Sequence, residues 1–201
     1  MKLYHHPLST FSRRIRMQLI EKGVSIDEVL IDMTKAEHKG PAYKTLNPYG
    51  RVPLLVDGSF VLYESSAIMD YLETVFPEPP LLPQSAQSRA LVAMHIKLCD
   101  VEFGSQTRSV IFPRRFFPRE RWDVPSQEKA IDGIAKHLGI LEAQLTGKSY
   151  LVDDRYTLAD LAYTPFVQFL PLLELTAPPN VARWIARIEA RPSAQQTRPP
   201  K

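Results

Sequence analysis

The sequence predicts a small α/β domain with a mixed four-stranded sheet, followed by an all-α domain. Strand-like and helix-like segments alternate through residues 1–76, in the order βαβαββα. A proline-rich run at residues 77–83 then interrupts every periodic pattern, and no strand pattern appears beyond it. We therefore expect a first domain at 1–76, an extended linker at 77–84 and a helical domain at 85–201.

The first domain reads as a βαβ unit followed by a ββα unit. The expected βαβ unit has a strand at Lys2 to Tyr4, a helix at about Ser9 to Lys22 and a strand at Ile26 to Ile31. A weak helix near His38 to Leu46 follows. The ββα unit has a hairpin around Asp57-Gly58 and a helix ending at Phe76. An Asp-Gly pair between two apolar runs is typical of a tight hairpin turn. This order predicts a mixed sheet with helices on its faces.

The second domain reads as helices only. The expected helices are two long ones at about Ser85 to Phe112 and Gln127 to Leu145, and two shorter ones near Thr157 to Phe169 and Asn180 to Ala190. Thr157 and Asp160 have the spacing of a capping box, in which each side chain satisfies a backbone N–H near the helix start. The tail at 193–201 is rich in proline and polar residues, so we expect it to fray.

Composition excludes several classes of protein. The chain of 201 residues is 44% hydrophobic, which is enough for real cores, yet no run approaches the ~20 apolar residues that span a bilayer. The single cysteine, Cys99, excludes an internal disulfide, and the N-terminus lacks a signal-peptide pattern, so a cytoplasmic protein is expected. The net charge of +3 comes from mostly scattered basic residues without a nucleic-acid-binding module.

Metal binding is not expected. His5 and His6 are adjacent on a strand, so their side chains face opposite sides of the sheet. No third candidate ligand lies nearby in the sequence.

One stretch of the first domain carries most of the chemical information. Its second hairpin strand runs directly into a helix that begins with Ser65 and Ser66, and the unpaired N–H groups of a helix start favour an anion. Val52 precedes Pro53, which pushes its backbone towards the extended form that pairs with peptide-like ligands. The pattern fits a small acidic peptide, and it also fits an ordinary hairpin followed by a serine-capped helix.

The run Asn-Pro-x-x-x-Val-Pro-x-Leu from Asn47, then Asp-Gly, then Glu-Ser-x-Ala-Ile from Glu64, resembles the glutathione-binding half of the glutathione S-transferase superfamily. The resemblance extends over nearly the whole chain. It implies a thioredoxin-like first domain with a cis bond at Pro53. It also implies that the backbone of Val52 pairs with the cysteinyl part of glutathione, and that Glu64 and Ser65 hold its γ-glutamyl end.

The same resemblance implies contacts at the glycine end of glutathione. His38 and Lys39 lie where several classes contact the glycine carboxylate. Arg51 replaces the Gln or Lys that the family often has before Val-Pro, and its charge suits an anionic ligand.

The turn after the first strand reads Ser9-Thr10-Phe11-Ser12. In thioredoxin-like proteins a Cys-x-x-Cys motif occupies this turn, so its absence argues against dithiol redox chemistry. The pattern is similar to the serine-type theta, phi, tau and zeta classes, and their catalytic serine matches Ser9, which would donate a hydrogen bond to the glutathione sulfur. Thr10 and Ser12 are the alternatives, and any of the three hydroxyls also suits simple helix capping.

The resemblance also implies an electrophile pocket. Ser105, Arg108, Ser109 and Phe112 are three or four residues apart on the first long helix of the second domain, so they share one face. This helix lines the pocket in the family, and Phe11 would join it from the first domain. The same side chains would equally suit core or dimer contacts.

The sequence thus resembles that of a cytosolic, homodimeric detoxification enzyme that ionises bound glutathione and conjugates it to small hydrophobic electrophiles. Glutathione is the co-substrate, and no metal, nucleic acid or membrane is expected as a partner. A glutathione-dependent isomerase is an alternative, because Ser9-Thr10-Phe11-Ser12 partly resembles the zeta-class Ser-Ser-Cys-Ser motif. A non-catalytic transferase-like binding or regulatory module is the third hypothesis.

Overall fold

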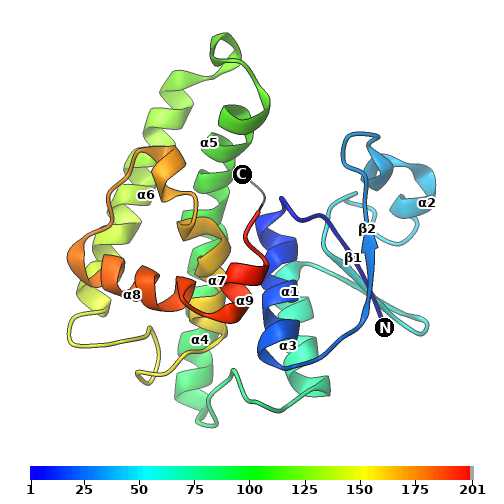
Figure 1. Ribbon diagram of the computed structural model, residues 1–201, viewed down its shortest axis with the longest axis horizontal. Helices are drawn as coiled ribbons and strands as arrows, with labels where there is room; N and C mark the ends of the chain where they lie inside the picture. Colours follow the sequence, from blue (N-terminus) through cyan, green and yellow to red (C-terminus); the bar gives the residue numbers. More distant parts are fainter. Residues whose placement is uncertain (200–201) are drawn as a thin grey trace. The chain divides into compact units, whose positions relative to one another are not determined.

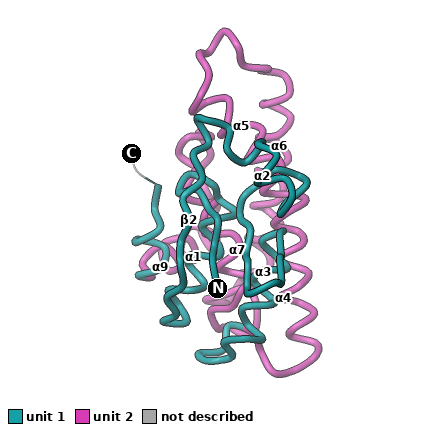
Figure 2. The backbone as a smooth tube through the Cα atoms, turned by 90° about the vertical axis from the view of Figure 1, so that its right-hand side faces the viewer, with its two compact units in different colours: residues 1–81, 192–201 teal, residues 82–191 magenta. Residues whose placement is uncertain are grey.

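The computed structural model describes residues 1–199 as two compact units. Unit 1 contains Met1–Leu81 together with the residues from Pro192 onward, and unit 2 contains Leu82–Arg191 (Figure 2). Along residues 1–199, every helix is too short or too polar to cross a membrane.

Unit 1 is built on the predicted mixed sheet of four strands. The strands are β1 (Lys2–His5), β2 (Asp27–Leu30), β3 (Leu54–Asp57) and β4 (Phe60–Tyr63), in the spatial order β2-β1-β3-β4. β1 pairs with β2 in parallel, and the other two pairings are antiparallel. The fold therefore confirms the predicted βαβ and ββα units of a thioredoxin-like domain.

The helices of unit 1 follow the predicted order. They are α1 (Thr10–Glu21), the 3₁₀ turn η1 (Glu37–Lys39), α2 (Pro41–Lys44), α3 (Ser65–Val75) and α9 (Pro192–Gln196). α1 and α3 pack together beside the sheet, and α2 lies at its opposite face (Figure 1). The weak helix expected near residues 38–46 forms two short pieces because Gly40 precedes a proline and is held in an extended conformation.

Buried polar contacts extend unit 1 beyond α3 into the linker. The Lys22 ammonium on α1 lies 2.8 Å from a carboxylate oxygen of Glu73 on α3 and also donates to the Pro79 carbonyl at 3.0 Å. The other oxygen of Glu73 accepts from the Leu81 N–H at 2.7 Å. The linker segment up to Leu81 is therefore fastened to unit 1 although it has no regular structure.

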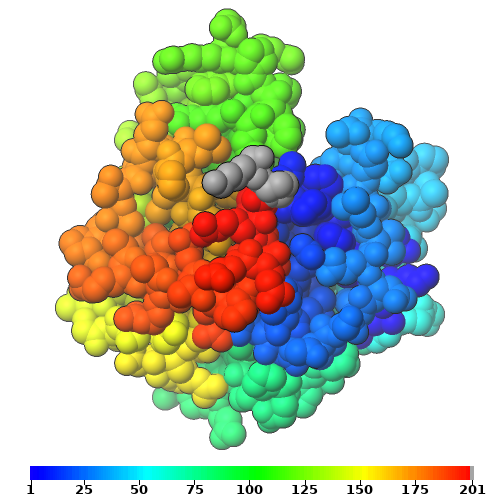
Figure 3. All heavy atoms as spheres, in the orientation of Figure 1, coloured from blue at the N-terminus to red at the C-terminus, as the bar shows by residue number. Residues whose placement is uncertain are grey.

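The prediction of a frayed tail at 193–201 is wrong for residues 193–199, and residues 200–201 lie outside the described part of the chain. Residues 192–199 form α9 and the turn after it, and they pack against α1 in unit 1, red beside blue in Figure 3. The buried Arg13 side chain donates to the Thr197 carbonyl at 2.7 Å, and the Ser193 hydroxyl bonds to Glu21. A long-range partner orders a segment whose composition alone indicates disorder.

Unit 2 is all-α, as predicted. Its elements are α4 (Ala86–Leu98), the π-helical turn η2 (Cys99–Gly104), α5 (Ser105–Phe116), the 3₁₀ turn η3 (Arg119–Arg121), α6 (Val124–Gln144), α7 (Leu158–Val167), the 3₁₀ turn η4 (Leu170–Leu173) and α8 (Pro179–Glu189). Every residue of α7 is buried, and α7 packs against α4, η2 and α8. α7 is therefore the central helix of the unit.

The long helix predicted from Ser85 to Phe112 contains a π-helical turn that the periodicity does not reveal. This turn, η2, joins α4 to α5 and carries the buried Cys99. At its end, a Cβ atom on Gly104 would lie 3.0 Å from a ring carbon of Phe166 on α7 and 3.0 Å from the Cys99 carbonyl oxygen, so a larger residue would force these neighbours to shift.

The start of α7 confirms the predicted capping box and shows a wider network. The Thr157 hydroxyl accepts from the Ala159 N–H at 3.2 Å, and the Asp160 carboxylate accepts from the Thr157 N–H at 2.9 Å. The other carboxylate oxygen of Asp160 accepts from the Leu151 N–H at 3.1 Å and the Trp184 indole N–H at 2.9 Å. One buried carboxylate thus joins three segments of unit 2.

We predict that Asp160→Ala lowers the free energy of unfolding by at least ~3 kcal/mol, because it leaves three buried N–H donors without an acceptor. Urea denaturation of both proteins measures the difference. Asp132→Ala removes the same group from the exposed side of α6 and should change stability by less than ~0.5 kcal/mol. Equal effects of the two variants would contradict the role given to Asp160.

Unit 2 also buries two histidines. His95 on α4 is only 4% exposed, and burial lowers the pKa of its imidazole to about 4, with smaller contributions from His137 and Lys148. The pKa of His137 on α6 is also lowered by burial, although Glu102 opposes the shift, and its Nε2 lies 2.9 Å from the Tyr163 hydroxyl. Both rings are therefore held neutral at pH 7.

We predict that acid destabilises the fold through His95. Its folded-state pKa lies below the unfolded value of about 6.5, so the unfolded chain binds the proton more readily between these two values. The unfolding free energy should fall by on the order of 3 kcal/mol as the pH drops from 6.5 to 4. In urea titrations, the unfolding free energy of His95→Leu should depend much less on pH. If the pH dependence of this variant equals that of the parent protein, the prediction is wrong.

Candidate functional site

The turn between β1 and α1 places the Ser9 hydroxyl at a helix start. Its N–H donates to the His6 carbonyl at 3.0 Å, and its side-chain oxygen accepts from the Ser12 N–H at 3.2 Å. Ser9 is therefore the N-cap of α1, and of the three candidate hydroxyls it is the one that caps this helix. Because the oxygen acts as an acceptor in this cap, the hydroxyl hydrogen is left to donate to a ligand.

The two alternative hydroxyls lie in different settings. Ser12 is fully buried, and its oxygen accepts from the His6 N–H at 3.4 Å. Thr10 is half-buried as the first residue of α1. Phe11 is also half-buried, and its ring lies 5.0 Å from the Arg14 guanidinium carbon.

The Val52–Pro53 peptide bond is cis, as the family resemblance implied. The chain just before it is held by two donors, since the Tyr43 hydroxyl and the Asn47 amide each lie 2.8 Å from the Arg51 carbonyl oxygen. Val52 packs against the cluster that contains Tyr43. The backbone at Val52 is thereby set in one position beside the sheet.

The start of α3 combines a buried hydroxyl with an unusual backbone. Ser65 is buried as the first residue of the helix, and its oxygen accepts from a guanidinium nitrogen of Arg14 at 3.3 Å. Glu64 occupies the N-cap position with φ of 72°, and its exposed side chain makes no capping hydrogen bond. Such a conformation costs roughly 1–3 kcal/mol in a residue with a side chain and is concentrated at functional sites.

The segment that carries His38 and Lys39 packs against Gly50. The Lys39 ammonium donates to the Gly50 carbonyl at 2.9 Å, which anchors η1 to the loop before Val52. Burial lowers the pKa of His38, and the charges of Lys39 and His6 lower it further, so its ring is neutral at pH 7. Arg51 is exposed, with its guanidinium carbon 5.9 Å from the centre of the Tyr49 ring.

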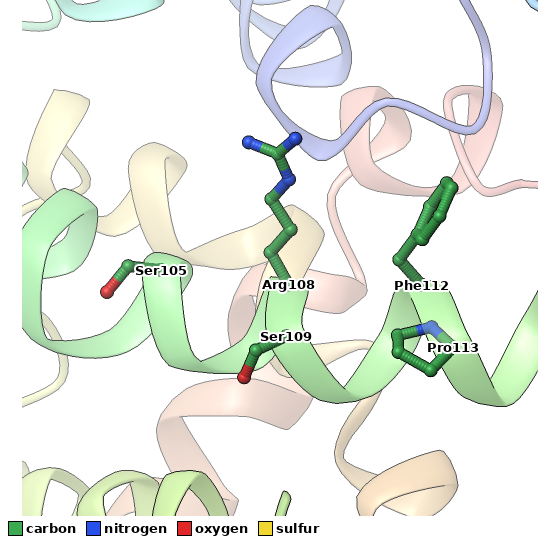
Figure 4. Close-up of a pocket in the computed structure, with 5 residues that line it drawn as sticks. All are labelled: Ser105, Arg108, Ser109, Phe112 and Pro113. Atoms are coloured by element: carbon green, nitrogen blue, oxygen red, sulfur yellow. The ribbon is translucent and has the colours of Figure 1, made fainter. Parts of the chain in front are cut away.

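Four of the five residues predicted for an electrophile pocket lie together in unit 2. Ser105, Arg108, Ser109 and Phe112 of α5, with Pro113, line a pocket of about 300 Å³ (Figure 4). Phe11, the fifth residue of that prediction, lies on α1 in unit 1 and is not among the lining residues.

Two features of unit 1 were not found from the sequence. No role was expected for Arg14 from the sequence, whereas the structure buries it and directs it to Ser65. A second pocket of about 410 Å³ opens beneath α2. It is lined by Tyr4, Ile31, Glu37, Gly40, Pro41, Ala42, Tyr43 and Leu46. Within residues 1–199, no three His, Cys, Asp or Glu side chains are grouped as a metal site would require.

Family models match both parts of the chain. Residues 8–75 match the glutathione S-transferase N-terminal domain, and residues 107–192 match the glutathione S-transferase C-terminal domain.

Individual proteins are similar over most of the chain. Glutathione S-transferase F6 of Arabidopsis thaliana is 34% identical over 98% of this chain and 98% of its own length. A stringent starvation protein A homolog of Coxiella burnetii is 32% identical over 91% of this chain and 82% of its own. The theta class glutathione S-transferase of Xanthomonas axonopodis, solved with glutathione bound, has a TM-score of 0.89 and 27% identity over 98% of this chain and 95% of its own.

We predict that Gly50→Ala displaces the segment that carries His38 and Lys39. Gly50 has φ of +57°, and an added Cβ would lie 2.6 Å from the His38 carbonyl oxygen, so the two backbones must separate. The unfolding free energy should fall by more than ~2 kcal/mol and the affinity for glutathione should weaken, as measured by denaturation and calorimetry.

Gly58→Ala is the matched control. Gly58 has a similar φ of +59°, but its added Cβ would meet nothing within 4 Å. This variant should lose only the ~1 kcal/mol that the backbone conformation costs, with glutathione affinity retained. Equal glutathione affinity in the two variants would mean that the Gly50 contact does not position the site.

Proposed function

Because the chain belongs to the glutathione S-transferase family and is an enzyme of that family, we propose that it ionises glutathione bound in unit 1 and conjugates it to small hydrophobic electrophiles. The observation that carries this proposal is the Ser9 hydroxyl at the start of α1, where the oxygen is engaged in capping and the hydrogen is free to donate.

The charges of unit 1 support the proposed glutathione pose. Glutathione has an amino group and a carboxylate at its γ-glutamyl end, amides in the middle and a carboxylate at its glycine end. Ser65 and the first amides of α3 suit the γ-glutamyl carboxylate, and Glu64 suits the amino group. Lys39, Arg51 and the neutral His38 would contact the glycine end.

The two hydrogen bonds that hold the Arg51 carbonyl support a backbone contact at Val52, in the middle of the ligand. Val52 would use its backbone N–H and C=O to pair with the cysteinyl residue, as a neighbouring strand would. Pro53 is buried and has no N–H of its own, so it orients Val52 without competing for the ligand.

The chemical task of Ser9 is to stabilise a thiolate. A free thiol has a pKa near 8.5, and lowering it by ~2 units requires ~2.7 kcal/mol of preferential stabilisation of the anion. The Ser9 hydroxyl and the positive end of the α1 dipole would supply this together. The thiolate then forms a carbon–sulfur bond, and the leaving group departs with its electron pair.

The proposal also covers the electrophile pocket, the cellular location and the oligomeric state. The α5 pocket would hold the electrophile, and its 300 Å³ suits a small one. We also propose a cytoplasmic, homodimeric detoxification enzyme that requires no metal, nucleic acid or membrane. These features follow from the family resemblance.

One relative supports a different function. The Coxiella burnetii protein is named for stringent starvation and not as a transferase, which favours the hypothesis of a non-catalytic binding or regulatory module. A glutathione-dependent isomerase is the other alternative. Glutathione binding at millimolar concentration, followed by assays with electrophiles and with isomerase substrates, distinguishes all three.

We predict that Ser9→Ala lowers kcat/KM for conjugation to 1-chloro-2,4-dinitrobenzene by about 100-fold, because the sulfur loses its hydrogen-bond donor. The pKa of bound glutathione should rise towards that of the free thiol, as measured by the ultraviolet absorbance of the thiolate. Loss of the helix cap should cost about 1 kcal/mol of stability, which leaves the protein folded.

Three variants test the assignment. Ser9→Thr keeps both the cap and the donor and should retain a lowered thiol pKa, whereas Thr10→Val and Ser12→Ala should leave that pKa unchanged. If Ser9→Ala conjugates as fast as the parent protein, the role of Ser9 is wrong, and whichever other variant loses activity identifies the donor. A parent protein that binds no glutathione would favour the non-catalytic module.

A further inference from the structure

The pocket on α5 contains a cation that has no partner among the described residues 1–199. Among residues 1–199, Arg108 forms no hydrogen bond, ion pair or contact with an aromatic ring, and its side chain is exposed. The next arginines along the chain both have partners. Arg114 donates a hydrogen bond to the Gln127 side-chain oxygen, and one of its guanidinium nitrogens lies 3.7 Å from a carboxylate oxygen of Glu174. The guanidinium of Arg115 lies over the ring of Phe169. The charge of Arg108 is therefore the one in this pocket that a ligand can use.

Arg108 lies beside an exposed aromatic surface. Arg108 and Phe112 are one helical turn apart and project from the same side of α5 (Figure 4). Residues at this helical spacing have Cβ atoms roughly 5–6 Å apart. Phe112 is 49% exposed although its ring packs against those of Phe116 and Phe117 at centroid distances of 5.0 and 5.5 Å. A ligand with an apolar body and a nearby anionic group would contact both residues.

The serine hydroxyls of the pocket are not available to bind an anionic group of the ligand. Ser105 donates to the Val101 carbonyl and Ser109 to the Gln106 carbonyl, at 2.7 Å for the second. Both hydrogens are used inside the helix, so the guanidinium is the available hydrogen-bond donor among the lining side chains. A planar guanidinium with parallel N–H groups matches the two oxygens of a carboxylate.

We propose that the α5 pocket selects electrophiles that carry a carboxylate on a compact aromatic body, with Arg108 holding the carboxylate and Phe112 the ring. This inference rests on the proposed transferase function and deepens it by naming a substrate class. The pocket volume of about 300 Å³ limits the body to about one substituted ring.

The reaction for such a substrate balances without a further reagent. With 4-chloro-3-nitrobenzoate, the glutathione thiolate attacks the ring carbon that bears chlorine and forms a carbon–sulfur bond. The carbon–chlorine bond then breaks, and chloride leaves with the electron pair. The carboxylate takes no part in bond making, so it is free to remain paired with Arg108.

The test compares 4-chloro-3-nitrobenzoate with the neutral 4-chloro-3-nitrobenzamide. For each substrate, kcat/KM is divided by the rate constant of its uncatalysed reaction with glutathione, which removes the difference in intrinsic reactivity. The parent protein should favour the benzoate by about tenfold in this ratio, as expected for a charge-assisted contact at a partly exposed site. The preference should weaken in high salt.

Arg108→Gln should bring the ratio of benzoate to benzamide close to one, whereas Arg108→Lys should retain part of the preference because it keeps the charge without the planar fork. Arg183→Gln removes the same charge from the exposed surface of α8 and should leave the ratio unchanged. A ratio near one in the parent protein, or an unchanged ratio in Arg108→Gln, would overturn the assignment to Arg108.

Failure of the proposed function has a different signature. A protein that conjugates 1-chloro-2,4-dinitrobenzene but shows no preference for the benzoate retains the transferase function and refutes the substrate class. A protein that binds glutathione but conjugates none of the three electrophiles refutes the proposed conjugation, and the inference falls with it.

Discussion

The candidate site of unit 1 depends on the polar contact between the buried sides of α1 and α3. Arg14 on α1 donates to the Ser65 hydroxyl at 3.3 Å, and one turn further along the Gln18 amide donates to the Met69 carbonyl at 2.8 Å. Buried groups of this kind are costly when unpaired, so the two helices are held in one register. The same register fixes the start of α1 relative to the start of α3, and these two starts carry Ser9 and Ser65.

Under the proposed function, this arrangement would leave the recognition of glutathione mainly to the backbone. The start of α3, the chain at Val52 and the capped start of α1 present main-chain groups whose positions follow from the fold. Side chains then adjust the charge, since Glu64 contributes a carboxyl group and burial lowers the pKa of His38, which leaves its ring neutral at pH 7. The positive φ of Glu64 fits the same pattern, because the residue is kept in a costly conformation where a ligand would use it.

The parts that could be predicted from the sequence are those set by neighbouring residues. The hairpin and the capping box of α7 each lie within a few residues of their own signal. The cis bond before β3 and the ligand were expected only from the family resemblance. The missed parts depend on distant partners. Arg13 donates a hydrogen bond to Thr197, which is 184 residues away in the sequence, and Gly104 permits α7 to approach η2. No local sequence pattern therefore predicts the ordered tail or the close packing of these helices.

The two units also differ in how freely their candidate sites can change. In unit 1, Pro53 and Ser65 are buried and the backbone near Gly50 is closely packed, so a substitution such as Gly50→Ala should disturb both stability and binding. In unit 2 the side chains of Ser105, Arg108, Ser109 and Phe112 are exposed, and removing them leaves few buried groups unpaired. If the α5 pocket holds the electrophile as proposed, selectivity for it can be altered there at little cost in stability. The proposed thiol site, in contrast, would be constrained by the same contacts that hold α1 against α3.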